Sequence, residues 1–467
     1  MKSRIFLLFL LLWVTFSTIN AEITLPTIFQ SNMLLQQRTT VRIWGKATPN
    51  KKISLLTSWA LKRYRTTSDA QGNWEVEFTT PRAGGPHSIT ITDGQVLTLS
   101  NILIGELWLC SGQSNMEMPM KGFPSQPVEG SNMDLLRSEN SQIRLFTVKR
   151  NANIHPQDEV SGRWEEAMPI SVRDFSATAY YFGRLLQETL KVPVGLINAS
   201  WGGSSIEAWM SADMLRAFPE AVAPTTNEGV KDPNRKPTML YQAMIHPIID
   251  MPVKGVIWYQ GESNADRSYS YANMFKAMVE GWREKMNEPN PIPFYFCQIA
   301  PYKYNNLNSA YLREAQLKAT KQVEHTGMAV LMDTGESNNI HPAKKREAGE
   351  RLALLALNKT YNFQGIAAES PTFKDIEIRN DTIIVNFDGA PMGLSARNFQ
   401  SELFMVAGED RVFHPATTAR INRSRIIVKS DKVDHPIAVR YAFDDFVVGD
   451  LFSTEGLPVS SFRSDSW

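Results

Sequence analysis

Four short polar clusters of this chain each follow an apolar run, and the first cluster contains a candidate nucleophile. The segment Gly112-Gln-Ser-Asn115 comes directly after the apolar run Glu106–Cys110. A serine on a sharp turn at the end of a buried strand exposes its hydroxyl group, and the next amide can face a developing oxyanion. One such cluster is weak evidence, because Gly, Ser and Asn also mark ordinary turns. The other three clusters are Ser200–Ser205, Tyr259–Asn264 and Asn338–Pro342.

A serine hydroxyl is a weak nucleophile and needs a base within hydrogen-bond reach. Of the seven histidines, His341 begins a predicted helix just past a predicted strand end, on the same rim as Ser114. His246 precedes another predicted strand and is a second histidine that could line the site. A lone histidine is more often structural, but His341 lies in one of four clusters at the same predicted sheet edge, which favours a catalytic role. We therefore predict that Ser114 is the nucleophile and His341 its base.

A tetrahedral acyl intermediate also requires hydrogen-bond donors for its oxygen. The backbone amide of Ser114 can supply one, an amide of Gly202 or Gly203 a second, and the side-chain amide of Asn264 a third. The sequence does not decide between the two glycines. Each residue alone is more often part of a turn, but their joint occurrence after successive strands predicts a shared oxyanion hole.

The centre of the chain alternates predicted strands with predicted helices. This alternation predicts an α/β fold with a parallel sheet and helices on both faces. Ligands of such folds bind outside the carboxyl ends of the strands, where all four polar clusters fall. The predicted strands cover residues 105–111, 192–199, 253–259, 292–299 and 327–333, and the predicted helices cover Phe175–Leu190, Tyr271–Met286, Tyr311–Val323 and Ala343–Leu357.

Short alternating segments separated by turn signals flank this centre on both sides. Such alternation is typical of small antiparallel sandwiches. We predict a signal peptide at residues 1–21, a β domain at 22–101, the α/β domain at 102–362 and a second β domain at 363–467.

The start of the chain has the three parts of a secretory signal. Lys2 and Arg4 precede an apolar core at Ile5–Phe16, and Ile19–Ala21 offers a small-residue cleavage site. The core is short for a transmembrane helix, and an uncleaved anchor is the alternative. The sequence therefore predicts export, to a secreted or periplasmic location, and no membrane contact after the signal is removed.

Composition excludes several classes of partner. The formal net charge is +1, and Lys and Arg are scattered among Asp and Glu, so the basic stripe of a nucleic-acid binder is missing. Cys110 and Cys297 both lie in apolar runs and are expected to be buried free thiols. No Cys and His occur at ligand spacing, so we expect no metal. The eleven Trp fit either carbohydrate contact or core packing.

The four clusters resemble those of the sialate O-acetylesterases within the SGNH hydrolase superfamily, which is named for a Ser, a Gly, an Asn and a His in four blocks. Gly112–Asn115 is similar to the Ser block, Trp201–Ser204 to the Gly block, Gln260–Asn264 to the Asn block and Ile340–Pro342 to the His block. The resemblance runs from about Glu22 to the carboxyl terminus, where Glu455–Pro458 and Phe462-Arg463 also match the family pattern.

The resemblance implies a flavodoxin-like sheet and an exported esterase that uses no cofactor. Its substrate would be a small-molecule or oligosaccharide acetyl ester, and 9-O-acetylated sialic acids are the first expectation. An acetylesterase for plant polysaccharides such as xylan or pectin side chains is the alternative within the same chemistry. A carbohydrate-binding protein without activity is the alternative of another class. The sequence does not indicate an oligomeric state.

One position departs from the superfamily pattern. Members often carry an Asp three residues before the His, and Asn338 stands there in this chain. Asp333 or Glu336 could orient His341 instead, or a backbone carbonyl could do so in a Ser–His dyad, which is the arrangement we favour. Two further residues of the third cluster are candidates for the pocket, Gln260 and Glu262; the second could equally be the structural partner of an amide or an arginine.

A sialic acid substrate adds a requirement for positive charge. Its carboxylate calls for an arginine that faces the pocket. Arg173, Arg267 and Arg313 lie in predicted rim loops or helices, and the sequence does not choose among them.

Overall fold

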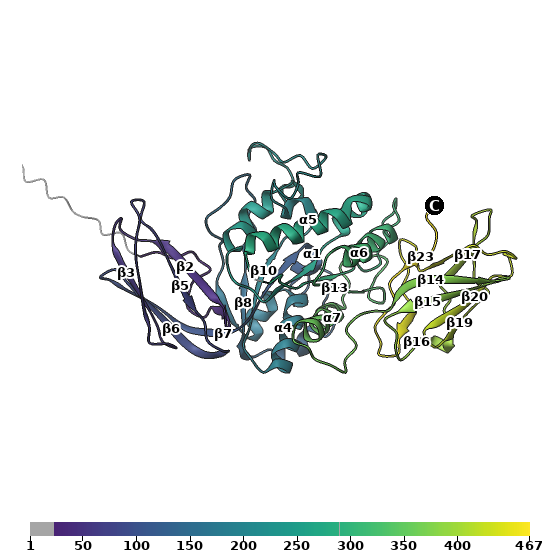
Figure 1. The fold of residues 1–467 in the computed structure, drawn as a ribbon, viewed down its shortest axis with the longest axis horizontal. Coiled ribbons are helices and arrows are strands. Elements are labelled where there is room, and N and C mark those ends of the chain that lie inside the picture. The colour runs from purple at the N-terminus through teal and green to yellow at the C-terminus, as the bar shows by residue number, and fades with distance from the viewer. Residues whose placement is uncertain (1–22, 289) are drawn as a thin grey trace, which may run out of the picture.

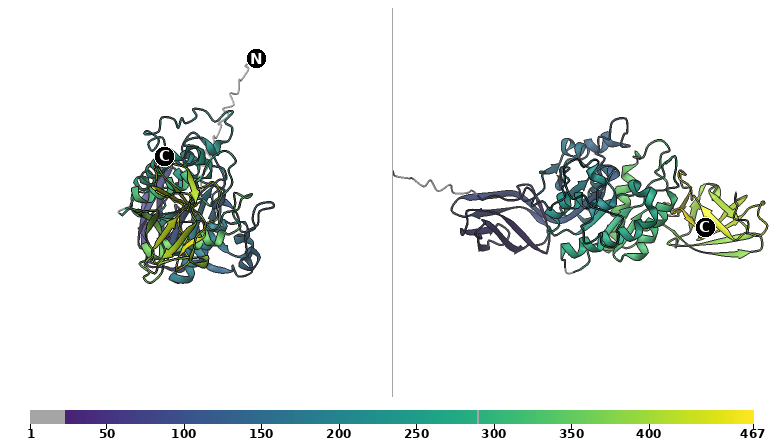
Figure 2. Two further views of the ribbon diagram at one scale, coloured as in Figure 1. Left: turned by 90° about the vertical axis from the view of Figure 1, so that its right-hand side faces the viewer. Right: turned by 90° about the horizontal axis from the view of Figure 1, so that it is seen from above.

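Three regions of the chain lie in a row, with β structure at both ends and an α/β region between them (Figures 1 and 2). The computed structural model describes residues 23–288 and 290–467. The predicted signal peptide at residues 1–21 lies outside the described residues. Within these two ranges no helix combines the length and apolarity needed to span a bilayer.

A parallel sheet forms the middle of the central region. Its strands follow the order β13-β12-β11-β7-β10-β8-β9, and only the edge pair β8 and β9 is antiparallel. The strands are β7 (Val96–Gly112), β8 (Asn140–Thr147), β9 (Trp164–Ala167), β10 (Val194–Ser200), β11 (Gly255–Tyr259), β12 (Phe294–Cys297) and β13 (Thr326–Ala329).

The strand order reverses at β7, which pairs with β10 on one side and with β11 on the other. The register places Gly112 opposite Ser200 and also opposite Tyr259. Three of the four polar clusters therefore begin at one level of the sheet, at the point where open α/β sheets bind their ligands.

Both faces of the sheet are buried because helices cover each of them. Val256 and Trp258 of β11 belong to one core, whereas Ile257 and Tyr259 belong to the other. Parallel strands buried on both faces have continuous apolar runs, which is why the predicted strands were recognisable. The helices of the first core are α5 (Ser268–Met286) and α6 (Ala310–Gln322), and those of the second are α4 (Ala177–Leu190) and α7 (Lys345–Leu355), as Figure 1 shows.

The amino-terminal β region is joined to the central sheet by one continuous strand. The first half of β7 pairs antiparallel with β6, and its second half belongs to the parallel sheet. Asn101 adopts a left-handed conformation, with φ 55°, between the two halves. The other strands of this region are β1 (Leu34–Gln36), β2 (Thr40–Lys46), β3 (Lys52–Thr57), β4 (Arg63–Thr67), β5 (Asn73–Thr79) and β6 (Gly84–Thr92).

The carboxyl-terminal β region consists of two four-stranded antiparallel sheets and a short strand pair. It contacts the central region through Arg313 of α6, which is fully buried and donates to Ser461 Oγ at 3.1 Å. The strands are β14 (Thr372–Arg379), β15 (Thr382–Asp388), β16 (Leu394–Ala396), β17 (Phe404–Ala407), β18 (Phe413–Pro415), β19 (Thr418–Asn422), β20 (Arg425–Lys429), β21 (Ala438–Tyr441), β22 (Leu451–Ser453) and β23 (Phe462–Arg463).

The two cysteines lie on β7 and β12. Cys110 and Cys297 are both buried and free, in agreement with the expectation of structural thiols. Burial raises the pKa of each thiol well above its usual value, so neither is a thiolate at neutral pH.

Candidate active site

The candidate nucleophile stands on a turn that only glycine can make. Gly112 ends β7 with φ 137°, and a Cβ there would lie 2.2 Å from the carbonyl oxygen of Tyr259. The amide of Gln113 donates to that same oxygen at 2.9 Å. Ser114 follows as the first residue of the short helix α1 (Ser114–Glu117). The turn thus fixes the serine at the carboxyl edge of the sheet, as the sequence predicts.

The structure brings Ser114 and His341 into contact across 227 positions of sequence. The distance from His341 Nε2 to Ser114 Oγ is 2.7 Å. The ring of Phe123 meets the imidazole edge-on, with 5.2 Å between the ring centroids. A serine hydroxyl and an imidazole in direct hydrogen bond form the pair that acyl transfer requires.

The other imidazole nitrogen contacts a residue that the sequence did not indicate. His341 Nδ1 donates to the side-chain carbonyl oxygen of Gln126 at 2.6 Å, if Nε2 accepts from the serine. Gln126 lies in a loop between α1 and the helix α2 (Ser131–Leu136), where it pairs with Phe123 through the backbone. No strand end or motif marks this position, so spacing offers no signal for it.

The three residues expected to orient His341 are occupied elsewhere. Asp333 forms a two-bond ion pair with Arg351 at 2.7 Å for each contact. Glu336 accepts from the amide of Ala343 at 2.7 Å, and Asn338 is exposed. The favoured partner, a backbone carbonyl, is not found at Nδ1 either, because the side-chain oxygen of Gln126 occupies that position.

Burial lowers the pKa of His341 to about 4, and the positive charge of Lys345 acts in the same direction. The imidazole is therefore neutral at neutral pH. A neutral imidazole has a free lone pair on Nε2, which is the form that can remove a proton from Ser114.

A buried polar chain lies behind the Ser114–His341 pair. Lys345 Nζ donates to Asn115 Oδ1 at 2.6 Å and to the carbonyl oxygen of Pro342 at 2.8 Å. Asn115 Nδ2 donates to Glu262 Oε1 at 2.5 Å. Burial lowers the pKa of Lys345 to about 7 and raises the pKa of Glu262. The chain ties the residue after the nucleophile to the residue after the histidine.

The candidate oxyanion donors differ in whether they are already bonded. The amide of Gly202 donates to Glu117 Oε2 at 2.8 Å, and Arg150 pairs with the other oxygen of Glu117 at 2.6 Å. The amides of Ser114 and Gly203 have no partner among the described residues. These two amides can bind an oxygen without displacing a carboxylate.

Asn264 is buried in a network of side chains. Its Nδ2 donates to Glu207 Oε2 at 3.0 Å, and its Oδ1 accepts from the amide of Ile206 at 3.0 Å. Gln260 Nε2 donates to the same Oδ1 at 2.7 Å, so Gln260 supports Asn264 and not His341. The second N–H of the Asn264 amide has no partner among the described residues, but Asn264 is not one of the residues that line the pocket around Ser114 and His341.

Comparison with known proteins decides the family. A family model described as "Carbohydrate esterase, sialic acid-specific acetylesterase" matches residues 104–358, which is more than half of the chain. This chain belongs to that family. The predicted family and enzyme class are thereby confirmed, and the protein is a serine esterase. The alternative of a carbohydrate-binding protein without activity is not supported.

Individual relatives of this carbohydrate esterase agree with the family match. It is 29% identical over 408 residues to the sialate O-acetylesterase of Mus musculus, with 74% of each chain covered. The sialate O-acetylesterase of Homo sapiens is also 29% identical, over 374 residues, with 72% of this chain and 70% of the human protein covered.

A solved structure, described as a novel carbohydrate acetylesterase from Xanthomonas citri, extends the likeness to nearly the whole esterase. The two share 35% identity with a TM-score of 0.87, over 96% of this chain and 100% of the other. The predicted fold class, an SGNH-type α/β sheet with additional β domains, is confirmed.

The catalytic pocket of the esterase has a volume of about 480 Å³ and contains Ser114 and His341. Its arginines are Arg150 and Arg235, neither of which the sequence singled out. Arg235 is exposed, and its Nε donates to the carbonyl oxygen of Gly203 at 3.2 Å.

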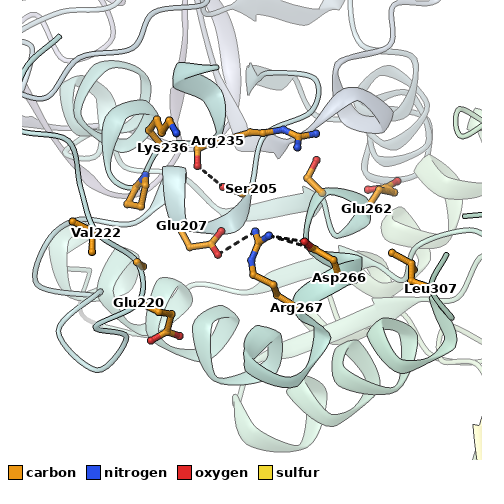
Figure 3. Close-up of a pocket in the computed structure, with 13 residues that line it drawn as sticks. Ser205, Glu207, Glu220, Val222, Arg235, Lys236, Glu262, Asp266, Arg267 and Leu307 are labelled. Carbon is orange, nitrogen blue, oxygen red and sulfur yellow. Dashed lines mark hydrogen bonds and ion pairs between the residues drawn. The ribbon is translucent and has the colours of Figure 1, made fainter. Parts of the chain in front are cut away.

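The three arginines named from the sequence do not line the catalytic pocket. Arg173 is on the surface helix α3 (Pro169–Asp174), where it pairs with Asp174, and Arg313 is buried against the carboxyl-terminal region. Arg267 lines a neighbouring pocket, shown in Figure 3. Arg235 ends the short 3-10 helix Pro233–Arg235, which lies outside the predicted elements, so the sequence carries no signal for it.

Proposed function

We propose that the protein removes acetyl esters from sugars, with 9-O-acetylated sialic acids as the leading substrate, through Ser114 and His341. The observation that carries this proposal is the 2.7 Å contact between Ser114 Oγ and His341 Nε2 inside an open pocket. Family membership supports the ester chemistry, and the pocket supports a ligand of sugar size.

The reaction proceeds by two acyl transfers. His341 Nε2 takes the proton of Ser114 while Oγ attacks the acetyl carbonyl, and the resulting imidazolium gives that proton to the departing sugar oxygen. Water then attacks the acetyl-serine with His341 as base again, which releases acetate and restores Ser114. The amides of Ser114 and Gly203, which have no other partner among the described residues, hold the oxyanion in both steps, and Asn264 is the third proposed donor.

The substrate assignment draws on the charge of the pocket. Arg235 lines the catalytic pocket and forms no ion pair within the described structure, so its guanidinium is free to bind a sugar carboxylate. Arg150 is less suited because Glu117 neutralises it. The second candidate is a neutral polysaccharide such as acetylated xylan, since the Xanthomonas citri protein is described as a carbohydrate acetylesterase with no particular sugar named.

Acetate release tests both the residues and the substrate. Ser114→Ala should abolish turnover of every acetyl ester without changing the melting temperature; turnover that persists in this variant would refute Ser114 as nucleophile. Wild-type enzyme is then compared on 9-O-acetylated sialic acid and on acetylated xylan. Arg235→Ala should raise KM about tenfold for the sialic acid ester, since a charge-assisted bond is lost, and should leave KM for xylan less affected.

We also propose that the protein is exported and becomes secreted or periplasmic, because residues 1–21 have the composition of a signal peptide. Protein recovered outside the cytoplasm should begin at Glu22 by amino-terminal sequencing. An intact Met1 on that protein would argue for a retained anchor.

A further inference from the structure

A second pocket adjoins the catalytic one and is drawn in Figure 3. We call it the side pocket; its volume is about 470 Å³, against about 480 Å³ for the catalytic pocket. The two share Arg235, Glu262 and Ser263 as lining residues. Both volumes lie in the range of ligand sites. The shared lining residues place the two pockets next to each other. A ligand longer than one sugar unit can therefore occupy both.

The far wall of the side pocket is a fixed set of charges. Arg267 pairs with Asp266 at 3.0 Å and with Glu207 at 3.4 Å, and Figure 3 shows its guanidinium between the two carboxylates. Glu207 is itself held by Asn264. The hydrogen-bond donors and acceptors of this wall are therefore held in place by one another before a ligand binds.

The opposite wall carries positive charge that has no counterion. Arg235 and Lys236 are exposed, and neither forms an ion pair within residues 23–288 and 290–467. Donors on one wall and carboxylates on the other suit a ligand whose groups both donate and accept. Sugar hydroxyls have this property.

Glu262, in the wall that the two pockets share, has an unsatisfied oxygen. The residue is 7% exposed, and its Oε1 accepts from Asn115, whereas its buried Oε2 has no hydrogen-bond partner. An unpaired buried carboxylate oxygen is costly, so the wall between the two pockets holds a polar group that the protein itself does not satisfy. Burial also raises the pKa of this carboxyl group, although the hydrogen bond from Asn115 acts in the opposite direction.

We propose that the side pocket binds the sugar unit adjacent to the acetylated sugar, so that the preferred substrate is an acetylated oligosaccharide rather than a free monosaccharide. This inference rests on the proposed function. Lys236, Asp266 and Arg267 contact the neighbouring unit, and Glu262 lies at the junction of the two pockets. The chemistry is shared by the glycan chain of a sialoside and by a plant polysaccharide.

The test compares substrates of different length. Two pairs of substrates are compared: acetylated sialyllactose with acetylated sialic acid, and acetylated xylotriose with acetylated xylose. In one pair the wild-type kcat/KM should be about tenfold higher for the longer substrate. That pair identifies whether the natural ligand is a sialoside or a plant polysaccharide. Lys236→Ala and Asp266→Ala should each lower the ratio of long to short substrate severalfold, mainly through KM. Lys318→Ala, which removes an exposed lysine on α6, is the matched control and should leave the ratio unchanged.

A binding measurement separates this inference from the proposed function. In the Ser114→Ala background, calorimetry with the unacetylated trisaccharides should show binding that Lys236→Ala weakens and Lys318→Ala does not. Equal kcat/KM for long and short esters, or equal binding by the two lysine variants, would refute sugar binding in the side pocket, even if ester hydrolysis is normal. Absence of hydrolysis of every acetyl ester would overturn the proposed function, and the calorimetry would still decide the side pocket.

Discussion

His341 is oriented by an amide oxygen, not by a carboxylate, and this sets the chemistry of the base. Gln126 Oε1 fixes the ring through Nδ1 at 2.6 Å but brings no negative charge to stabilise the imidazolium. Burial, and after it the Lys345 cation, lowers the pKa of His341 to about 4. Because the neutral form is the base, activity should be retained above pH 4 and lost as the pH falls through that value.

The role of Gln126 can be tested by removing or charging its side chain. Gln126→Ala should lower kcat about a hundredfold, since an unoriented base loses much of the benefit of general base catalysis. Gln126→Glu keeps the acceptor and adds a negative charge, which should raise the pKa of His341 and move the acid limb of kcat/KM to higher pH. The pH–rate profile of a chromogenic acetate ester measures both. Wild-type kcat in Gln126→Ala would show that another group orients the ring.

The charge of Lys345 should be visible in the same profile. The cation lowers the pKa of His341, second to burial, so Lys345→Met should raise that pKa and shift the acid limb of kcat/KM upward. Lys344→Met removes the neighbouring exposed lysine and serves as the control. An unchanged acid limb in Lys345→Met, alongside a lowered melting temperature, would assign Lys345 a purely structural role.

At the scale of elements, the end of β7 positions the nucleophile. Gly112→Ala should destabilise the fold by about 3 kcal/mol or more and abolish activity, because φ is positive and the new Cβ would overlap the Tyr259 carbonyl. Gly94 also has positive φ, 119°, but open space around it, so Gly94→Ala isolates the conformational cost at about 1 kcal/mol. Urea unfolding compares the two. Similar destabilisation by both would mean that the overlap is relieved by a backbone shift.

The part of this fold that the sequence predicts is the alternation of strands and helices in the central region. Buried parallel strands alternate with amphipathic helices, and their carboxyl ends must meet, so Ser114, Gly202 and His341 could be placed together without coordinates. Gln126 lies in a loop and Arg235 ends the three-residue 3-10 helix Pro233–Arg235, and neither kind of segment leaves a periodic pattern in the sequence. For the same reason, local alternation predicted a boundary at residues 101–102, whereas β7 runs continuously through these positions.

At the scale of the whole molecule, the carboxyl-terminal region holds a loop of the central region that lines both pockets. Tyr304 lines the catalytic pocket and Leu307 lines the side pocket, and both belong to one loop before α6. Asp445 of the carboxyl-terminal region holds this loop: its carboxylate accepts from the amide of Tyr304 at 2.5 Å and from that of Ser309 at 3.4 Å. The carboxyl-terminal β region therefore fixes the position of a loop that lines both pockets.

Asp445→Ala tests this role. Loss of two charge-assisted bonds should destabilise the protein by about 2 kcal/mol and raise KM for an acetylated oligosaccharide severalfold, because the loop with Tyr304 and Leu307 gains freedom. The effect on kcat should be smaller, since Ser114 and His341 do not depend on this loop. Asp431→Ala removes an exposed carboxylate of the same region and is the control for stability and KM. Thermal unfolding and steady-state kinetics measure both, and a KM equal to that of Asp431→Ala would show that the carboxyl-terminal region leaves the pocket walls unaffected.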